Sequence, residues 1–418
     1  MNGMLYVYKS MLNKLQNERR NTIIFILFIV MTGALFISRA LLSASMIVFI
    51  LVSFLHSNSK KQVYDFFSTP LLWGMSVLFL IPFISGLWSS DKKEWLDMIR
   101  IKLPLLFLPI AFASPFSFSK KQWEWLGYIF IALITGGTLW CMYHYLQDTA
   151  VIHEGYLRAK TFFTPLENDR VRFSWLVSIA ALLAGWLAFS KQKSERTTSL
   201  VLITVAGWLA VFLHILAVRT GLFSFYSMLF MTAAWMIIKN RKKGYSVILL
   251  ILLIAMPVTA YFTLPTFQNR IKYINYDYGY FSKANYLPGG NDALRVISIK
   301  GGWNIMKENP VTGTGFGDVL TETRLWYASH YPGMREEDKL YPGSEWMMYG
   351  AGSGIPGFVL FTVVMLIPFF VQVKDKILWW LLNATAAFSF LFDIGLEVQF
   401  GVFTWSFIVL WWWKWLKQ

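Results

Sequence analysis

Cysteine and histidine are scarce in this sequence, which has one cysteine and five histidines in 418 residues. Cys141 has no second cysteine to pair with, so neither an intrachain disulfide nor a cysteine-based metal site can form. The histidines are scattered without the spacing that metal ligands show. The residues therefore predict neither a metal site nor another cofactor.

Alternating polar and apolar residues, which would indicate the strands of a membrane β-barrel, are also absent. Instead, 56% of the residues are hydrophobic, the mean hydropathy is +0.49, and apolar runs of 15–22 residues recur along the chain. A run near 20 residues matches a hydrocarbon core about 30 Å thick, where a helix satisfies its own backbone. The sequence predicts an all-α, polytopic integral membrane protein.

Twelve apolar segments are expected to cross the membrane. We place the first nine within residues 1–264, a large loop domain at 265–352, and the last three within 353–418. The predicted segments are 23–38, 40–55, 70–88, 101–115, 122–146, 173–190, 199–217, 221–238, 245–264, 353–372, 377–394 and 401–416.

Basic residues indicate the orientation of these segments. With the N-terminus in the cytoplasm, the inner segments hold 19 basic and four acidic residues, which accounts for the whole net charge of +15. Such an excess on the inner loops is the usual orientation signal of membrane proteins. We therefore expect both termini in the cytoplasm, and we attribute the positive charge to orientation rather than to nucleic-acid binding. The inner segments are 1–21, 56–69, 116–121, 191–197, 239–244, 373–376 and 414–418.

The loop at 265–352 faces the periplasm or the cell exterior in this topology. It is too long for a simple connector, it holds nine basic and nine acidic residues, and it includes a helix-like stretch after Asp292. Long loops of this kind are usually functional. Arg219 lies on the same side, in AVRTG between two apolar runs. Because a charge inside a spanning segment costs about 2.5–3.5 kcal/mol on insertion scales, Arg219 indicates either a functional site or an interface.

Arg295 is the second candidate for binding an anion. The stretch 292–317 predicts a helix with Asp292 as its N-cap, an apolar stripe that begins at Val296, and Arg295 in the first turn. A helix N-terminus favours anions, although a solvated arginine on an amphipathic helix is equally compatible with this pattern. The following TGTGFG lacks the lysine of a phosphate-binding loop, and a tight loop that returns the chain to the membrane explains it better.

Several other charged residues are predicted near the outer membrane face. Each is compatible either with a hydrated or interfacial position or with a polar cavity. They are Arg170, Arg172, Glu345, Asp393 and Glu397.

Three segments together resemble the O-antigen ligase/polymerase family. They are AVRTGLFSFY, then LRVISIKGGWNIMKENPVTGTGFG in the large loop, then YPGSEWMMYGAGSGIPGFVLF. The segment GLWSSDKKEWLDMIRIKLPLLFLPIAF at 86–112 also looks like the early part of that family. Each motif is loose, but their order and spacing are fairly specific.

The resemblance implies a metal-independent glycosyltransferase of the bacterial inner membrane, with its active site on the periplasmic face. It implies that the enzyme transfers a glycan from undecaprenyl diphosphate to an acceptor such as lipid A-core, or to another glycan or protein in related polymerases and O-oligosaccharyltransferases. Arg219 and Arg295 correspond to the arginines that hold the diphosphate, which suits the planar guanidinium because it binds phosphate oxygens in pairs.

One position departs from the family pattern. Where the family carries a histidine that prepares the acceptor hydroxyl, this chain has Gly343. Three explanations stay open: a substitution in an otherwise intact enzyme, a loss of activity, or another residue in the same role. Glu345 and His330 are the nearest candidates for that role. A transporter or flippase is an alternative for a chain of twelve helices, but we see no similarity between its two halves, as many carriers show.

Overall fold

The computed structural model describes residues 2–158, 160–192, 194–239, 243–283 and 285–418. Part of the basic loop 239–244 therefore lies outside the described residues. Within them the chain is helical and contains no strand. The main helices are α1 (Asn2–Ile37), α2 (Arg39–Ser53), α3 (Ser59–Ser68), α4 (Pro70–Ser85), α5 (Lys92–Phe112), α6 (Lys120–Gln147), α7 (Thr149–Tyr156), α8 (Pro165–Asn168), α9 (Arg170–Lys191), α10 (Arg196–Leu216), α11 (Arg219–Ile238), α12 (Lys243–Thr263), α13 (Pro265–Phe281), α14 (Asp292–Glu308), α15 (Val319–His330), α16 (Glu345–Phe370), α17 (Lys376–Leu391) and α18 (Gln399–Lys417).

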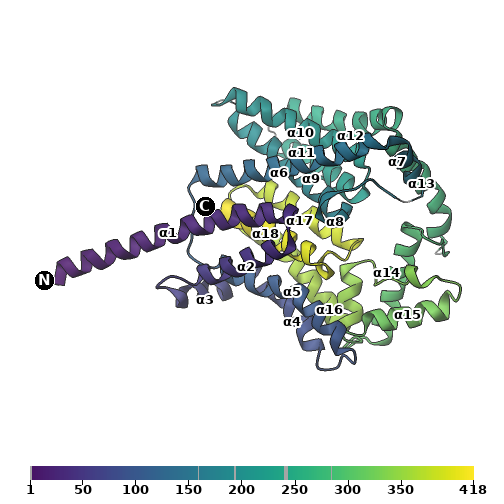
Figure 1. Cartoon of the computed structure of the whole chain (residues 1–418), viewed down its shortest axis with the longest axis horizontal. Coiled ribbons are helices and arrows are strands. Elements are labelled where there is room, and N and C mark those ends of the chain that lie inside the picture. The colour runs from purple at the N-terminus through teal and green to yellow at the C-terminus, as the bar shows by residue number, and fades with distance from the viewer. Residues whose placement is uncertain (1, 159, 193, 240–242, 284) are drawn as a thin grey trace.

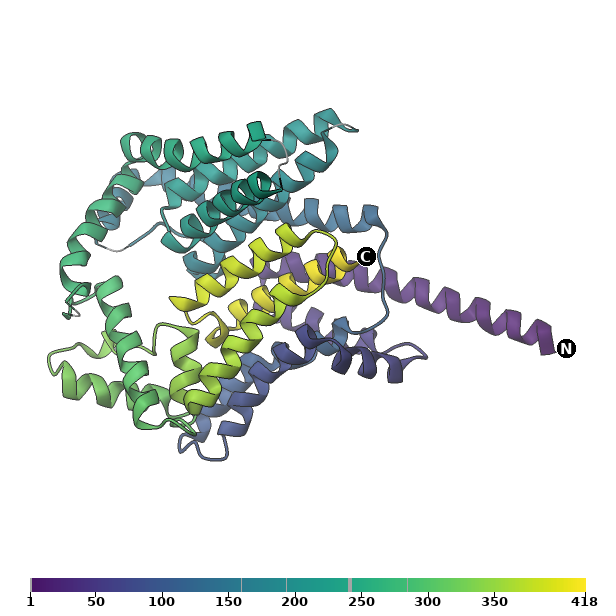
Figure 2. The same ribbon diagram turned by 180° about the vertical axis from the view of Figure 1, so that it is seen from behind.

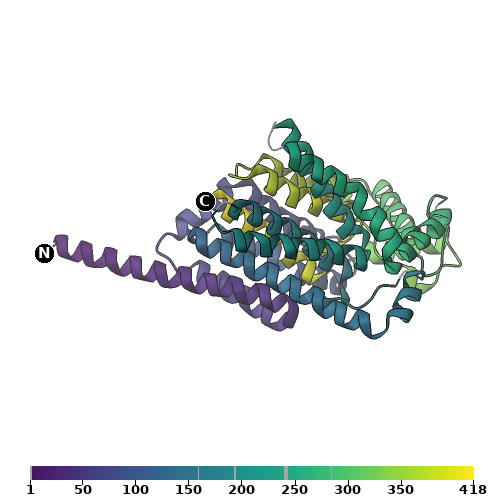
Figure 3. The same cartoon turned by 90° about the horizontal axis from the view of Figure 1, so that it is seen from above.

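The long apolar helices form a bundle in which they run roughly side by side (Figures 1 and 3). The helix α9 packs against α10 and α11, α16 packs against α4 and α17, and α18 packs against α5. Figures 1 and 2 show α14 and α15 at one end of the molecule, opposite the free N-terminal end of α1. The C-terminus lies toward the α1 side of the bundle. On which side of a membrane each end lies stays a prediction.

Each of the twelve predicted segments overlaps a helix, but not every helix is long and apolar enough to cross a membrane alone. Among the described residues seven helices meet that criterion, or eight if α3 and α4, which meet at an angle of 83°, form one broken span. Arg39–Ser53 and Lys376–Leu391 are shorter apolar helices. The all-α membrane fold is therefore confirmed, while the count of twelve spans stays a prediction.

The glycine-rich segment TGTGFG reaches into a break in α16. Gly354 has a left-handed backbone conformation with φ of 68°, which interrupts the helix, and the amide of Ile355 donates to the carbonyl of Pro310. The amides of Thr314 and Gly315 donate to carbonyls of α16, at 2.9 and 3.0 Å. The amides at 316 and 317 donate to serine hydroxyls at the end of α4. Since these four amides already have protein acceptors, the loop anchors α14 to the bundle and does not offer them to a phosphate.

The helix α14 buries a different face from the one that the sequence predicts. The predicted stripe of Val296, Ile299, Trp303 and Met306 is wrong at Trp303, which is 42% exposed, although Met306 is buried. Leu294 and Ile297 are buried against α15 instead. Gly301 and Gly302 share this buried face, and a Cβ at Gly301 would lie 2.9 Å from the Trp326 ring. Glycines therefore complete a packing surface that a count of large apolar residues does not detect.

Candidate functional site

Arg219 begins a helix because the chain breaks immediately before it. Ala217 ends α10 in the left-handed conformation, with φ of 48°, and Val218 is extended. A non-glycine residue there is strained, which is a feature common at functional sites. Two residues later Gly221 approaches α9 so closely that a Cβ would lie 2.5 Å from the Cβ of Ser174. The RTG sequence therefore places a guanidinium at a helix start that is held tightly against α9.

The guanidinium of Arg219 forms an ion pair with Asp292, the first residue of α14. The prediction that Asp292 caps α14 is wrong. The carboxylate of Asp277 in α13 caps the helix instead, and accepts hydrogen bonds from the amides of Asp292 and Ala293 at 2.8 and 3.2 Å. This exchange of roles leaves the Asp292 side chain free to bridge α14 to α11. Arg219 keeps about a third of its side chain exposed.

Arg295 lies one turn after Asp292 on the same face of α14, as three residues of separation require. It is partly buried and lies within electrostatic range of both Arg219 and Asp393. Burial lowers the pKa of Arg295, although the carboxylate of Asp393 opposes the shift. The two arginines that the resemblance singles out are 76 positions apart in the chain. The fold brings them to one place.

Gly343 lies directly beside Arg295. Its amide donates to the hydroxyl of Ser298 at 3.0 Å. A Cβ added to Gly343 would lie 2.8 Å from that hydroxyl, which would have to rotate away, and 3.1 Å from the Cγ of Arg295. Its φ is outside the left-handed region, so the backbone at this position does not require glycine. A larger side chain at position 343 would extend next to the arginine cluster.

Two further arginines complete a cluster of four. Arg170, at the start of α9, lies within electrostatic range of Arg295. Arg270, in α13, lies within electrostatic range of both Arg170 and Arg219. None of Arg170, Arg270 and Arg295 forms an ion pair within 4 Å among the described residues. Arg270 is buried whereas the other three arginines are partly exposed, and a buried positive charge is costly unless an anion compensates for it.

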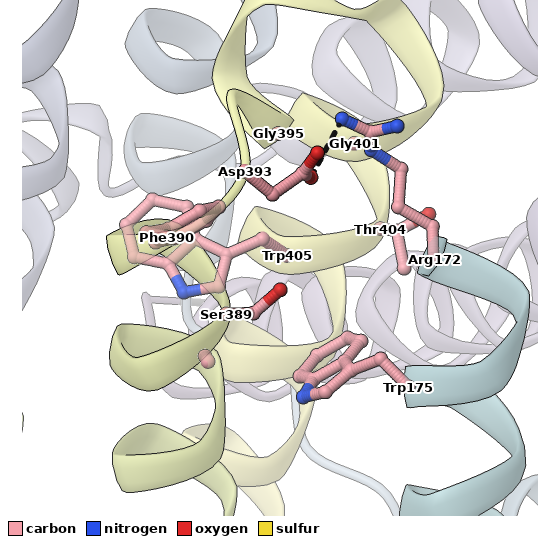
Figure 4. Close-up of a pocket in the computed structure, with 10 residues that line it drawn as sticks. Arg172, Trp175, Ser389, Phe390, Asp393, Gly395, Gly401, Thr404 and Trp405 are labelled. Atoms are coloured by element: carbon pink, nitrogen blue, oxygen red, sulfur yellow. Dashed lines mark hydrogen bonds and ion pairs between the residues drawn. The ribbon is translucent and has the colours of Figure 1, made fainter. Parts of the chain in front are cut away.

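Arg172 has a structural role beside this cluster (Figure 4). Its guanidinium donates to Asp169 and, at 3.0 Å, to Asp393, so it joins α9 to the segment that precedes α18. These residues border a cavity of about 20 Å³ that is lined also by Thr404 and Trp405, roughly the space of one water molecule. Arg172 is therefore already neutralised, unlike Arg170.

The two glutamates among the predicted site residues belong to one buried network. Glu345 has no exposed surface, and its carboxylate accepts the amide of Leu396. Glu397 forms an ion pair of 2.5 Å with Lys102, which is also fully buried. Glu345 lies within electrostatic range of both Glu397 and Lys102. Sequence reasoning missed Lys102 because its partner lies almost 300 positions away.

His330 contacts neighbouring residues of α15 and not the arginines or glutamates described above. Its ring stacks on Trp326, and its Nδ1 interacts with the hydroxyl of Ser329 and the carbonyl of Trp326. None of these contacts involves Gly343 or an arginine of the cluster.

Sequence reasoning also missed Arg270 and the ion pair of Asp292. The polar sequence PTFQNRIKY around Arg270 looks like an ordinary surface helix, so the local sequence carried no signal.

A helical membrane protein with converging arginines on one side of its bundle fits an enzyme that handles a lipid-linked anion. The family model described as O-Antigen ligase matches residues 204–362, the segment that carries Arg219, Arg270, Arg295 and Gly343. The resemblance to the O-antigen ligase family is therefore confirmed over that segment, and it supports a membrane glycosyltransferase of the O-antigen ligase or polymerase type. A search among curated proteins found no match for this chain.

Proposed function

We propose that this protein transfers a glycan from undecaprenyl diphosphate to an acceptor on the periplasmic face of the bacterial inner membrane. The acceptor we favour is lipid A-core, and both termini lie in the cytoplasm in this proposal. The observation that supports it most is the convergence of Arg219 and Arg295, which come from different helices and lie within electrostatic range of each other. Arginine pairs of this kind bind diphosphates.

The reaction consists of one displacement at the anomeric carbon. The acceptor hydroxyl oxygen forms a bond to that carbon, the bond from the carbon to the phosphate oxygen breaks, and its electron pair leaves with the diphosphate. The hydroxyl proton passes to a base or to solvent. A single displacement of this kind inverts the stereochemistry. Guanidiniums fixed in a partly buried site stabilise the charge that develops on the leaving group.

The position of Gly343 supports a substitution within an otherwise intact site. Neither Glu345 nor His330 matches the family histidine in place, since Glu345 is fully buried in its network and His330 stacks on Trp326. A side chain at 343 would lie next to Arg295, where the sugar-bearing phosphate is expected. We therefore propose that Gly343 leaves the acceptor hydroxyl without a positioned base, and that this chain has low activity as it stands.

Reconstitution of the purified protein with undecaprenyl-diphosphate glycan and lipid A-core tests the proposal. We expect Gly343→His to raise the transfer rate by about 10²–10⁴, the range that general bases supply. Adding Arg219→Ala to that variant should abolish transfer. Transfer rates that neither substitution changes would exclude this assignment of the site.

The lipopolysaccharide of a deletion strain shows which of the candidate acceptors the enzyme uses. Core without O-antigen indicates a ligase, core with a single repeat unit indicates a polymerase, and a loss that is confined to glycoproteins indicates an O-oligosaccharyltransferase. We expect the first result. The second or third result would leave the proposed donor site in place and assign a different acceptor.

A further inference from the structure

A groove lies between α1 and α6, near the residues where the apolar parts of both helices begin. The stretches Gln16–Ile37 of α1 and Lys120–Gln147 of α6 are each long and apolar enough to cross a membrane. The groove has a volume of about 380 Å³, which is within the range of about 300–1,000 Å³ that ligand sites occupy. Its lining consists of Phe25, Ile29, Ser119, Lys121, Gln122, Trp125 and Ile129.

The lining changes from polar to apolar along the groove. Its polar residues lie at the N-cap and in the first turn of α6, whereas Trp125 and Ile129 lie one and two turns further into the apolar part of that helix. Phe25 and Ile29 of α1 form an apolar wall opposite them. Trp125 is 51% exposed, as is common for a tryptophan at a membrane surface. A phospholipid has the same order of chemistry, with a polar headgroup above an apolar chain.

The polar end of the groove is suited to an anion. Ser119 and Gln122 form a capping box in which each side chain accepts the amide of the other residue. The amide of Trp123 donates to the carbonyl of Ser119 at 3.1 Å. The amides of Lys120 and Lys121 have no protein acceptor within the described part of the chain. Two donors at a helix N-terminus, with a lysine side chain beside them, therefore remain for a ligand.

Basic residues outnumber acidic ones around the groove. The stretches 16–29 and 115–129 contain two acidic residues, Glu18 and Glu124. Glu124 is already paired with Lys191 of α9, at 2.9 Å, so Glu18 is the acidic residue left to oppose the basic ones. The four basic residues are Arg19, Arg20, Lys120 and Lys121.

Arg20 adds a buried positive charge at the segment that leads into the groove. The residue is 4% exposed, and its Nε and Nη1 are buried without a hydrogen-bond partner among the described residues. Its Nη2 donates to the carbonyl of Pro115 at 3.0 Å, four residues before Ser119. Because buried charges are costly when they are unpaired, Arg20 favours an anion at this end of the helices.

We propose that this groove binds an anionic phospholipid. Its phosphate lies at the start of α6 beside Lys121, and an acyl chain lies along Phe25, Ile29 and Trp125. Basic pockets between membrane helices bind anionic headgroups in this way. The groove contains no residue of the arginine cluster, so the inference goes beyond the proposed function and does not depend on it.

Native mass spectrometry of the full-length protein tests this inference, with phosphatidylglycerol and phosphatidylethanolamine of equal acyl chains as probes. We expect phosphatidylglycerol to bind about fivefold more tightly or better. Lys120→Gln combined with Lys121→Gln should weaken it about tenfold or more, since one basic side chain near an anionic lipid contributes about fivefold. Lys60→Gln combined with Lys61→Gln, in the first turn of α3, is the matched control. It removes the same charge away from the groove and should change the affinity less than about twofold.

A second substitution tests the apolar part of the groove without changing its charge. Ile29→Trp places a larger side chain where the acyl chain is expected, so phosphatidylglycerol should again bind about tenfold more weakly. Ile26→Trp is the control, because Ile26 is 51% exposed on the same helix and does not line the groove. It should leave the affinity unchanged.

Three outcomes would overturn the inference. Equal losses from the two lysine pairs would show a general attraction between basic residues and anionic lipid. Equal affinities for the two lipids, unchanged by every substitution, would show surrounding membrane lipid only. A wild-type dimer that Ile29→Trp converts to a monomer, with unchanged lipid binding, would identify the groove as a contact between two copies of this chain. Each of these outcomes leaves the proposed glycan transfer in place.

Discussion

At the scale of single residues, the proposed function requires a phosphate oxygen to take the place on Arg219 that Asp292 occupies. The ion pair joins α14 to α11 when no donor is bound, with 32% of the Arg219 side chain and 16% of the Asp292 side chain exposed. A diphosphate must compete with this carboxylate for the guanidinium. We therefore expect the donor to displace Asp292 from Arg219 when it binds.

Replacing Asp292 with asparagine should therefore strengthen binding of undecaprenyl diphosphate. Partly exposed ion pairs contribute up to about 1 kcal/mol, so we expect the affinity to rise about two- to fivefold. Isothermal titration of the protein in nanodiscs measures it. Asp97→Asn removes a similar but exposed pair with Arg100 and serves as the control. A weaker affinity in Asp292→Asn would mean that Asp292 supports the binding conformation instead.

Asp338 makes the outer loop sensitive to acid. Burial alone would raise its pKa, but hydrogen bonds from the Tyr286 hydroxyl, the Gly289 amide and Arg335 lower the pKa overall. A carboxylate with a lowered pKa stabilises the folded loop above its unfolded pKa of about 3.9, and this contribution is lost as the pH falls further.

We therefore expect Asp338→Asn to destabilise the loop by about 1–3 kcal/mol at pH 7. The difference from the wild type should disappear as the pH falls below about 4. Hydrogen exchange at residues 286–289 measures this. A difference between variant and wild type that persists at low pH would contradict the charged interaction.

Some of the unusual charged residues could be singled out from the sequence, but their partners could not. Arg219 is conspicuous because a charge beside two apolar runs is costly. Arg270 lies in a polar helix, where a charge needs no explanation. Lys102 and Glu397 form their pair only after helices from the two ends of the chain pack together. The local sequence shows where a charged side chain is unusual, whereas tertiary contacts determine which group of opposite charge pairs with it.

At the scale of helices, close approach sets the geometry of the site. Gly221 allows the start of α11 to lie against Ser174 in α9, and the hydroxyl of Ser178 donates to its carbonyl at 2.9 Å. This contact holds the start of α11, and with it Arg219, against α9. The apolar runs predicted both helices, but the buried face of α14 was predicted wrongly because two glycines form part of it.

Gly221→Leu should separate α11 from α9 and displace Arg219. Overpacking of this kind costs about 1–3 kcal/mol, so we expect a lower Tm and diphosphate binding reduced at least tenfold. Gly207→Leu is the matched control, because no atom lies within 4 Å of a Cβ at that position of α10. Equal effects of the two substitutions would show that helix contact at Gly221 does not position the site.

At the scale of the whole molecule, the predicted topology separates a basic inner side from an outer side that carries the arginine cluster. Helix positions followed from the apolar runs. The number of spans did not, because several helices are short or broken, and burial by neighbouring helices can replace the length that a single crossing requires.

Cysteine labelling tests this topology, since Cys141 is the only cysteine and is fully buried. In intact spheroplasts, a membrane-impermeant maleimide should label Glu337→Cys in the outer loop and should not label Lys60→Cys in the predicted inner segment. Permeabilisation should expose Lys60→Cys. The opposite pattern would place the arginine cluster in the cytoplasm, which would exclude a periplasmic donor site.

The central claim is that Arg219 and Arg295 together bind one diphosphate. A cryo-electron microscopy structure of the protein in nanodiscs with undecaprenyl diphosphate tests it most directly. The account predicts density for the diphosphate between these two guanidiniums, with the Asp292 carboxylate displaced from Arg219. Diphosphate density elsewhere, with the ion pair of Arg219 and Asp292 intact, would contradict it.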